Sequence, residues 1–167
     1  MAVTPLEKVA IVGCGPGAPE YLTGAARRAI EQASVLAGAA HLLERYATPA
    51  HERIPVGADI EGALERIAAR RAGGKIAILV SGDPGLCSLA GPAIRRFGRA
   101  SCEVIPGISS VQLAFARAGL EWLDARIISA HKELPTVTPE ALKGFKSLAV
   151  LCGHRLAREW VAGLAAA

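Results

Sequence analysis

Three glycine- and proline-rich turns carry the residues of this sequence that are best suited to binding a small ligand. They are residues 13–18 (GCGPGA), 81–85 (SGDPG) and 106–110 (PGISS). Asp83 could accept hydrogen bonds from ammonium or hydroxyl groups of a ligand, or could close an Asx turn of its own. Ser109 and Ser110 could cap a helix or offer hydroxyls to a polar ligand group at its start. Because neither serine has a partnered His or Asp nearby in the sequence, they are no evidence for a hydrolase triad.

The first turn also matches the fingerprint of dinucleotide-binding proteins, with small residues at Gly13, Gly15 and Ala18. Two features argue against that interpretation. Pro16 and Pro19 remove backbone donors that a pyrophosphate would use. The acidic residue that holds a ribose about 20 positions further on is also missing, since residues 35–38 read VLAG. A nucleotide-binding oxidoreductase is therefore an alternative that the sequence does not favour.

Each of the three turns follows an apolar segment that predicts a buried strand. These strands are expected at residues 8–13, 75–80 and 102–105, with a further short one at 34–37. Amphipathic patterns predict helices at 22–33, 39–46, 60–68, 88–97 and from the third turn to about 117. This alternation predicts an α/β fold with a mostly parallel sheet, in which ligands gather beyond the carboxyl ends of the strands.

The predicted domain organisation is a larger N-terminal domain over residues 1–118, a linker at 119–125 and a partial C-terminal α/β domain at 126–167. The second domain should contain strands at 126–130 and 148–152, a helix that begins at Thr138-Pro139, and a last helix. Two strands and two helices are few for a closed sheet. We therefore expect this domain to be smaller and truncated or intertwined.

Composition and charge exclude several classes of protein. No apolar run approaches the ~20 residues of a membrane helix, and we expect a cytoplasmic protein. The four cysteines and four histidines show no spacing typical of metal ligands, so no metal site is predicted. The net charge is +4, but arginines are scattered and aromatics make up 4% of the chain, which disfavours nucleic-acid binding. These arginines either face solvent or bind a polycarboxylate ligand.

Taken together, the three turns resemble a known family much more specifically than any one of them does. In this order, residues 13–23 (GCGPGAPEYLT), 81–85 (SGDPG) and 104–120 (VIPGISSVQLAFARAGL) resemble the tetrapyrrole methylase superfamily. Within it the chain looks most like the precorrin-6Y methyltransferase family, in the half that methylates carbon 5, and residues 127–131 (IISAH) share that likeness. The resemblance covers the chain from Lys8 to about Leu164.

The resemblance implies a two-domain α/β protein, usually a homodimer, that binds S-adenosylmethionine and methylates a corrin-precursor tetrapyrrole, precorrin-6Y or its cobalt-containing counterpart. A separate or fused enzyme would then methylate carbon 15 and remove a carboxyl group. By motif position, the cofactor-binding residues would be Pro16, Ser81, Gly82, Asp83, Leu86, Ser109 and Ser110. Substrate contacts would fall to Gly15, Gly17 and His131. No residue is assigned as a catalytic base.

Two departures from the family pattern leave alternatives open. A His-Gly-Arg-like element reads His131-Lys132-Glu133 here, and the chain ends near residue 167, where the family continues. The alternatives are a superfamily member with a different acceptor, the oxidoreductase above, or a fragment that dimerises without binding cofactor.

Overall fold

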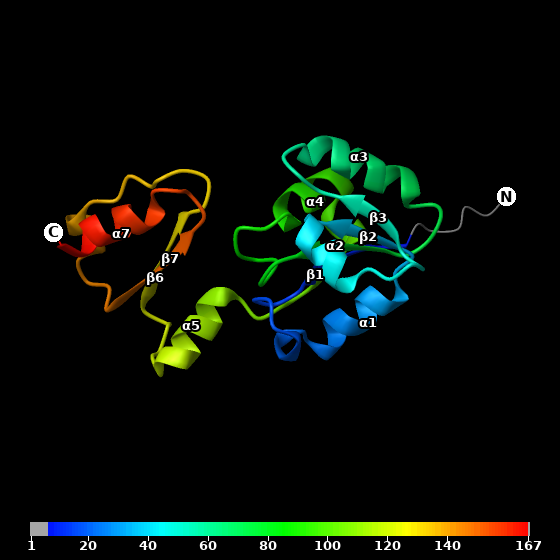
Figure 1. The fold of residues 1–167 in the computed structure, drawn as a ribbon. Coiled ribbons are helices and arrows are strands. Elements are labelled where there is room, and N and C mark those ends of the chain that lie inside the picture. The colour runs from blue at the N-terminus through cyan, green and yellow to red at the C-terminus, as the bar shows by residue number, and fades with distance from the viewer. Residues whose placement is uncertain (1–6, 167) are drawn as a thin grey trace. The chain divides into compact units, whose positions relative to one another are not determined.

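The computed structural model describes residues 7–166, which fall into two compact units that divide between Ser110 and Val111 (Figure 1). The first unit contains all three predicted turns. The second begins with most of helix α5 (Ser110–Ala118), a segment that the sequence prediction placed before its linker. The predicted boundaries at 118 and 125 remain a proposal about how the chain is organised.

The first unit is built on a parallel sheet of five strands: β1 (Val9–Gly13), β2 (Val35–Gly38), β3 (Glu52–Pro55), β4 (Ile76–Val80) and β5 (Cys102–Ile105). Their order is β3-β2-β4-β1-β5, and all neighbouring pairs are parallel. The predicted α/β fold with a parallel sheet is confirmed. Figure 1 shows helices covering this sheet on both sides.

Successive side chains of the central strands enter two different cores, because a strand points its residues alternately to opposite faces. On β4, Ile76, Ile78 and Val80 pack on one face, and Ala77 and Leu79 pack on the other. Helices α3 (Ile60–Arg70) and α4 (Ala90–Phe97) cover the first face. Helices α1 (Gly24–Gln32) and α2 (Ala40–Tyr46) cover the second. Burial on both sides explains why these strands read as unbroken apolar runs.

Side-chain caps begin two of these helices. Thr23 accepts a hydrogen bond from the backbone N–H of Ala26 at 3.1 Å, and α1 starts at the next residue. Asp59 accepts from the N–H of Gly62 at 2.9 Å at the start of α3. Each cap satisfies a backbone donor that has no partner within the helix.

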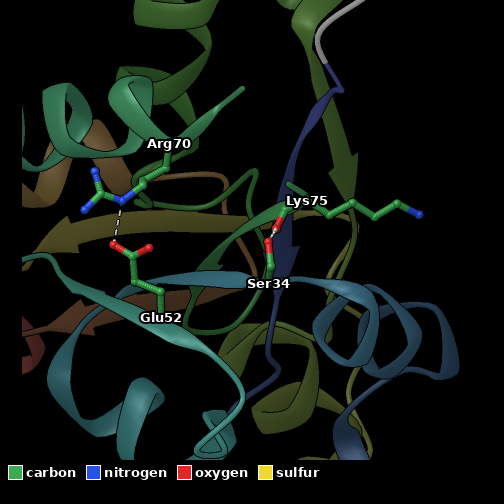
Figure 2. Close-up of polar contacts among 4 residues, drawn as sticks. All are labelled: Ser34, Glu52, Arg70 and Lys75. Atoms are coloured by element: carbon green, nitrogen blue, oxygen red, sulfur yellow. Dashed lines mark hydrogen bonds and ion pairs between the residues drawn. The ribbon is translucent and has the colours of Figure 1, made fainter. Parts of the chain in front are cut away.

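Strand β3 was not expected from the sequence. Its residues read ERIP, and Ile54 is its buried side chain. Because β3 lies at the edge of the sheet, it tolerates Pro55 and charged residues that a central strand would exclude. Two polar contacts lie at the end of the sheet where the strands begin (Figure 2). Arg70 of α3 pairs with Glu52 at 2.7 Å, and the Ser34 hydroxyl donates to the Lys75 carbonyl at 3.1 Å.

The two strands predicted for the second unit are present as β6 (Ala125–Ala130) and β7 (Ser147–Cys152), and they pair in parallel. The short helix α6 (Pro139–Leu142) lies between them in the chain, and Thr138 caps it by accepting from the N–H of Ala141 at 3.4 Å. Helix α7 (Ala157–Ala166) follows β7. In the first unit, short 3-10 helices at Pro19–Tyr21 and Arg99–Ser101 precede α1 and β5, respectively. Within residues 7–166, no helix is long and apolar enough to span a membrane.

Candidate functional site

The three predicted turns follow three adjacent strands of the first sheet. The strand order places β1 between β4 and β5, and residues 13–18, 81–85 and 106–110 come directly after these strands or overlap their last residue. Since parallel strands all end at the same edge, the turns gather there. Segments nearly 100 residues apart in the chain thus form one candidate site.

The boundary between β1 and β4 is a topological switch point of this sheet. The chain leaves β1 through α1 on one face and leaves β4 through α4 on the other. In open α/β sheets, this divergence of the following helices leaves room for a ligand beyond the strand ends.

A backbone bridge joins the first two turns at this point. The N–H of Gly15 donates to the carbonyl of Gly82 at 3.1 Å, and the N–H of Gly82 donates back to Gly15 at 2.8 Å. Both residues have a left-handed backbone conformation, with φ of +72° at Gly15 and +67° at Gly82. Glycine adopts this conformation more readily than other residues. The two turns are therefore held in fixed register by residues that need to be glycine.

Asp83 connects the second turn to the third. One carboxylate oxygen accepts from the N–H of Gly85 at 2.8 Å, and the other accepts from the N–H of Gly107 at 3.0 Å. The backbones also approach closely, because a Cβ on Gly107 would lie 2.8 Å from the carbonyl oxygen of Gly13. Glycine at these positions lets the turns meet without side chains between them.

The structure brings together all the residues predicted to bind the cofactor, in the first unit. Ser81 and Ser110 are exposed; Pro16, Gly82, Asp83 and Leu86 are half-buried; and Ser109 is buried. A Cβ on Gly82 would lie 3.7 Å from the Cα of Ser109, which places the second turn beside the start of α5. Of the predicted substrate contacts, Gly15 is buried in the first turn and Gly17 is exposed beside it.

His131 belongs to the second unit, where it directly follows β6. Its ring lies over Gly153, which follows β7: a Cβ added there would be 2.8 Å from both the Cγ and the carbonyl oxygen of His131. His154 lies next to this glycine and accepts a hydrogen bond from the N–H of Leu156 through Nδ1 at 3.2 Å. The carboxyl edge of the second sheet thus carries two imidazoles.

Helix α2 adds three contacts that the sequence analysis missed. His41 lies 3.3 Å from the Ser81 hydroxyl through Nε2, Arg45 donates to the carbonyl of Gly17, and Tyr46 donates to the carbonyl of Cys14 at 3.4 Å. The contact with Ser81 arises because α2 follows β2, which is the neighbour of β4 in the sheet. Without the strand order, nothing in the sequence links residue 41 to residue 81.

Burial changes the acidity of two side chains near the first turn. It raises the pKa of the Cys14 thiol to about 12, so this cysteine is not a nucleophile at neutral pH. Burial also raises the pKa of Tyr46, while the nearby Arg45 and Arg27 act in the opposite direction. Within the described part of the chain, no group of three His, Cys, Asp or Glu side chains is placed to hold a metal ion.

Comparison with known proteins identifies the family. A family profile described as Tetrapyrrole (Corrin/Porphyrin) Methylases matches residues 8–166. The chain belongs to this family. Members of the tetrapyrrole methylase family use S-adenosylmethionine, so this chain is an S-adenosylmethionine-dependent methyltransferase.

Individual relatives agree with the family assignment. The chain is 38% identical over 157 residues to the cobalt-precorrin-7 C(5)-methyltransferase of Salmonella typhimurium, covering 91% of this chain and 77% of the relative. It is similar to the crystal structure of the precorrin-6Y methylase of Archaeoglobus fulgidus, with a TM-score of 0.66, 27% identity, and coverage of 86% and 72%. A uroporphyrin-III C-methyltransferase from Thermus thermophilus, solved with S-adenosylhomocysteine, gives a TM-score of 0.68, 26% identity, and coverage of 95% and 72%.

The geometry of the turns fits a tetrapyrrole methylase better than a dinucleotide-binding protein. The N–H groups of Cys14 and Gly15 already donate to Val80 and Gly82, so they are not available to a pyrophosphate. A 3-10 helix follows the first turn, and α1 begins only at Gly24, whereas the dinucleotide fingerprint leads directly into a helix N-terminus. The oxidoreductase alternative is therefore not supported.

The residues of the first two turns that are not used in these backbone bonds fit S-adenosylmethionine. The Ser81 hydroxyl is exposed, the Asp83 carboxylate keeps lone pairs beyond its two backbone bonds, and a Cβ on Gly17 would meet open space. These groups suit the ammonium and hydroxyl groups of the cofactor and leave room for its bulk.

Proposed function

We propose that this chain methylates carbon 5 of a corrin precursor, precorrin-6Y or its cobalt-containing counterpart, in cobalamin biosynthesis. The observation that carries the proposal is the convergence of the three turns at the carboxyl ends of β4, β1 and β5. It is supported by the 38% identity to a cobalt-precorrin-7 C(5)-methyltransferase over nearly the whole chain.

In this proposal the first unit binds the cofactor. Ser81 and Asp83 hold its polar groups, with Gly82 and Leu86 beside them. Pro16 borders the cofactor from the first turn, and Ser109 and Ser110 border it from the start of α5. Support comes from the placement of all these residues around one sheet edge.

Substrate contacts are proposed for Gly15 and Gly17 in the first turn and for His131 in the second unit. At Gly17 a Cβ would meet open space, so the absence of a side chain there would let a flat macrocycle approach the backbone of the first turn. His131 would reach the substrate through a ring that is exposed to solvent.

The chemistry requires alignment more than reactive protein groups. S-adenosylmethionine supplies an electrophilic methyl group when it is bound. The residues of the turns orient the two reactants, and orientation alone can lower a barrier by about 7–11 kcal/mol. A fixed scaffold of backbone bonds between the turns, such as the Gly15–Gly82 bridge, suits this task because it needs no rearrangement during the reaction.

We further propose that the chain acts in the cytoplasm as a homodimer, with a separate or fused enzyme that carries out the methylation at carbon 15. These points rest on the family resemblance. Sedimentation of the purified chain measures the oligomeric state directly.

Isothermal titration with S-adenosylhomocysteine tests the cofactor site. We expect micromolar binding with one site per chain. Incubation with S-adenosylmethionine and precorrin-6Y or its cobalt form should then add a methyl group to the tetrapyrrole, located at carbon 5 by NMR. Methylation of uroporphyrinogen III instead would overturn the proposed substrate but not the cofactor site, and absence of S-adenosylhomocysteine binding would overturn both.

A further inference from the structure

Helix α2 contacts two of the three turns. Its residues His41, Arg45 and Tyr46 each contact a different backbone or hydroxyl group of those turns. Residues four positions apart lie on the same side of a helix, so His41 and Arg45 share one face, and Tyr46 follows Arg45 at the end of the helix. None of these three side chains belongs to the turns themselves, so the contacts reach the site from outside it.

The position of α2 is fixed by its apolar side, which also includes the partly buried Tyr46. Leu42 and Leu43 are 6% and 4% exposed and belong to the core that α1 and α2 build on the sheet. Arg45 and Tyr46 then tie the helix to the first turn at Gly17 and Cys14. An anchored helix holds the His41 ring beside Ser81 at a small cost in side-chain entropy.

The contact between His41 and Ser81 determines what the serine can offer a ligand. The two groups are separated by 3.3 Å, and either can be the donor. If the imidazole donates, the Ser81 hydrogen remains free for an acceptor on the ligand. If the imidazole accepts, that hydrogen is used and the serine offers lone pairs to a donor. In both cases the hydroxyl loses its free rotation.

We propose that His41 is a positioning residue that orients the Ser81 hydroxyl for cofactor binding. The inference rests on the proposed contact between Ser81 and S-adenosylmethionine. His41 itself need not touch the cofactor. Its effect is to prepare one hydrogen-bonding group of the site before the ligand arrives.

Titration calorimetry with S-adenosylhomocysteine on the full chain tests this role. His41→Leu should weaken binding about fivefold, the value of one ordinary hydrogen bond. His41→Gln should restore affinity to within about twofold, because its amide can also donate or accept near Ser81. Glu44→Gln, an exposed change on the same helix, is the matched control and should bind as the wild type does. Thermal unfolding of all variants without ligand should coincide.

A double-mutant cycle and steady-state kinetics separate positioning from a merely structural effect. After Ser81→Ala, the further change His41→Leu should have no effect on affinity, since there is no hydroxyl left to orient. In turnover, His41→Leu should raise the KM for S-adenosylmethionine and leave kcat unchanged. A lowered unfolding temperature together with a fall in kcat would overturn the inference in favour of a structural role.

The outcomes also distinguish this inference from the proposed function. If Ser81→Ala weakens binding and His41→Leu does not, the role of His41 fails and the cofactor site stands. If Ser81→Ala binds like the wild type, the proposed roles of both residues fail. Additive effects in the double mutant would likewise overturn the inference.

Discussion

At the scale of single residues, Asp83 has a structural role that its sequence context revealed only in part. Its two carboxylate oxygens accept from Gly85 in its own turn and from Gly107 in the next. The local sequence predicts either a ligand contact or an Asx turn at Asp83, and the bond from Gly85 closes that turn. The bond to Gly107 depends on the adjacency of β1 with both β4 and β5, which local sequence does not encode.

Asp83→Ala should therefore change both cofactor affinity and stability. We expect S-adenosylhomocysteine to bind roughly tenfold more weakly, as the loss of a charge-assisted hydrogen bond predicts. The unpaired N–H of Gly107 should also lower the free energy of unfolding by about 1–3 kcal/mol. Calorimetry and urea denaturation measure the two effects separately. Unchanged affinity in the variant would exclude the cofactor role of Asp83.

Gly13→Ala tests the close approach of the turns. The new Cβ would lie 2.5 Å from the backbone nitrogen of Gly107 and 2.8 Å from Pro84 Cδ. The backbone must shift, and we expect a loss of about 1–3 kcal/mol in the free energy of unfolding, measured in urea. Gly57→Ala is the control, because a Cβ there meets nothing within 4 Å. Equal stability of the two variants would contradict the packing described for the turns.

At the scale of elements, apolar patterns identified the strands of the described residues apart from β3, including the partly buried β6 and β7. Strands β1 and β4 are buried along almost their whole length, and their apolar runs identified them. β3 at the sheet edge buries Ile54 alone and gave no recognisable pattern. Helix α2 was predicted as an element, but its contacts with the turns were not, because they arise from the place of β2 beside β4.

Gly153→Ala tests the edge formed by β6 and β7. The added methyl would lie 2.8 Å from the Cγ and from the carbonyl oxygen of His131, so the ring or the chain must move. Because His131 is a proposed substrate contact, kcat/KM for the tetrapyrrole should fall while affinity for S-adenosylhomocysteine is kept. Gly163→Ala in α7 is the control, since a Cβ there meets open space. Full turnover by Gly153→Ala would count against a substrate role for His131.

At the scale of the whole molecule, the four cysteines differ in their exposure to solvent. Cys14 and Cys102 are buried in the first unit, whereas Cys87 and Cys152 are exposed. Burial raises the pKa of Cys14 to about 12 and also raises that of Cys102, against the opposing effect of Arg71 and Arg99. A raised thiol pKa means less thiolate at any given pH, and the thiolate is the reactive form.

Iodoacetamide at pH 8 should therefore modify Cys87 and Cys152 in the native protein and all four cysteines in urea. Peptide mass spectrometry identifies the modified positions. Raising the pH from 7 to 9 should leave Cys14 and Cys102 protected, because burial raises the pKa of both thiols. Rapid native labelling of Cys14 would be incompatible with the core described for the first unit.

The sequence by itself determined the α/β class, the strands of the described residues other than β3, and the membership of the tetrapyrrole methylase family. These follow from local patterns: apolar runs, glycines that permit tight turns, and motifs read in order along the chain. The tertiary structure alone decided that β1 separates β4 from β5, and hence that Gly15 bridges Gly82, that Asp83 reaches Gly107 and that His41 meets Ser81. Each of these contacts joins segments at least 24 residues apart. Such pairs are set by strand order and by the packing of helices on the sheet, which is a property of the whole folded unit.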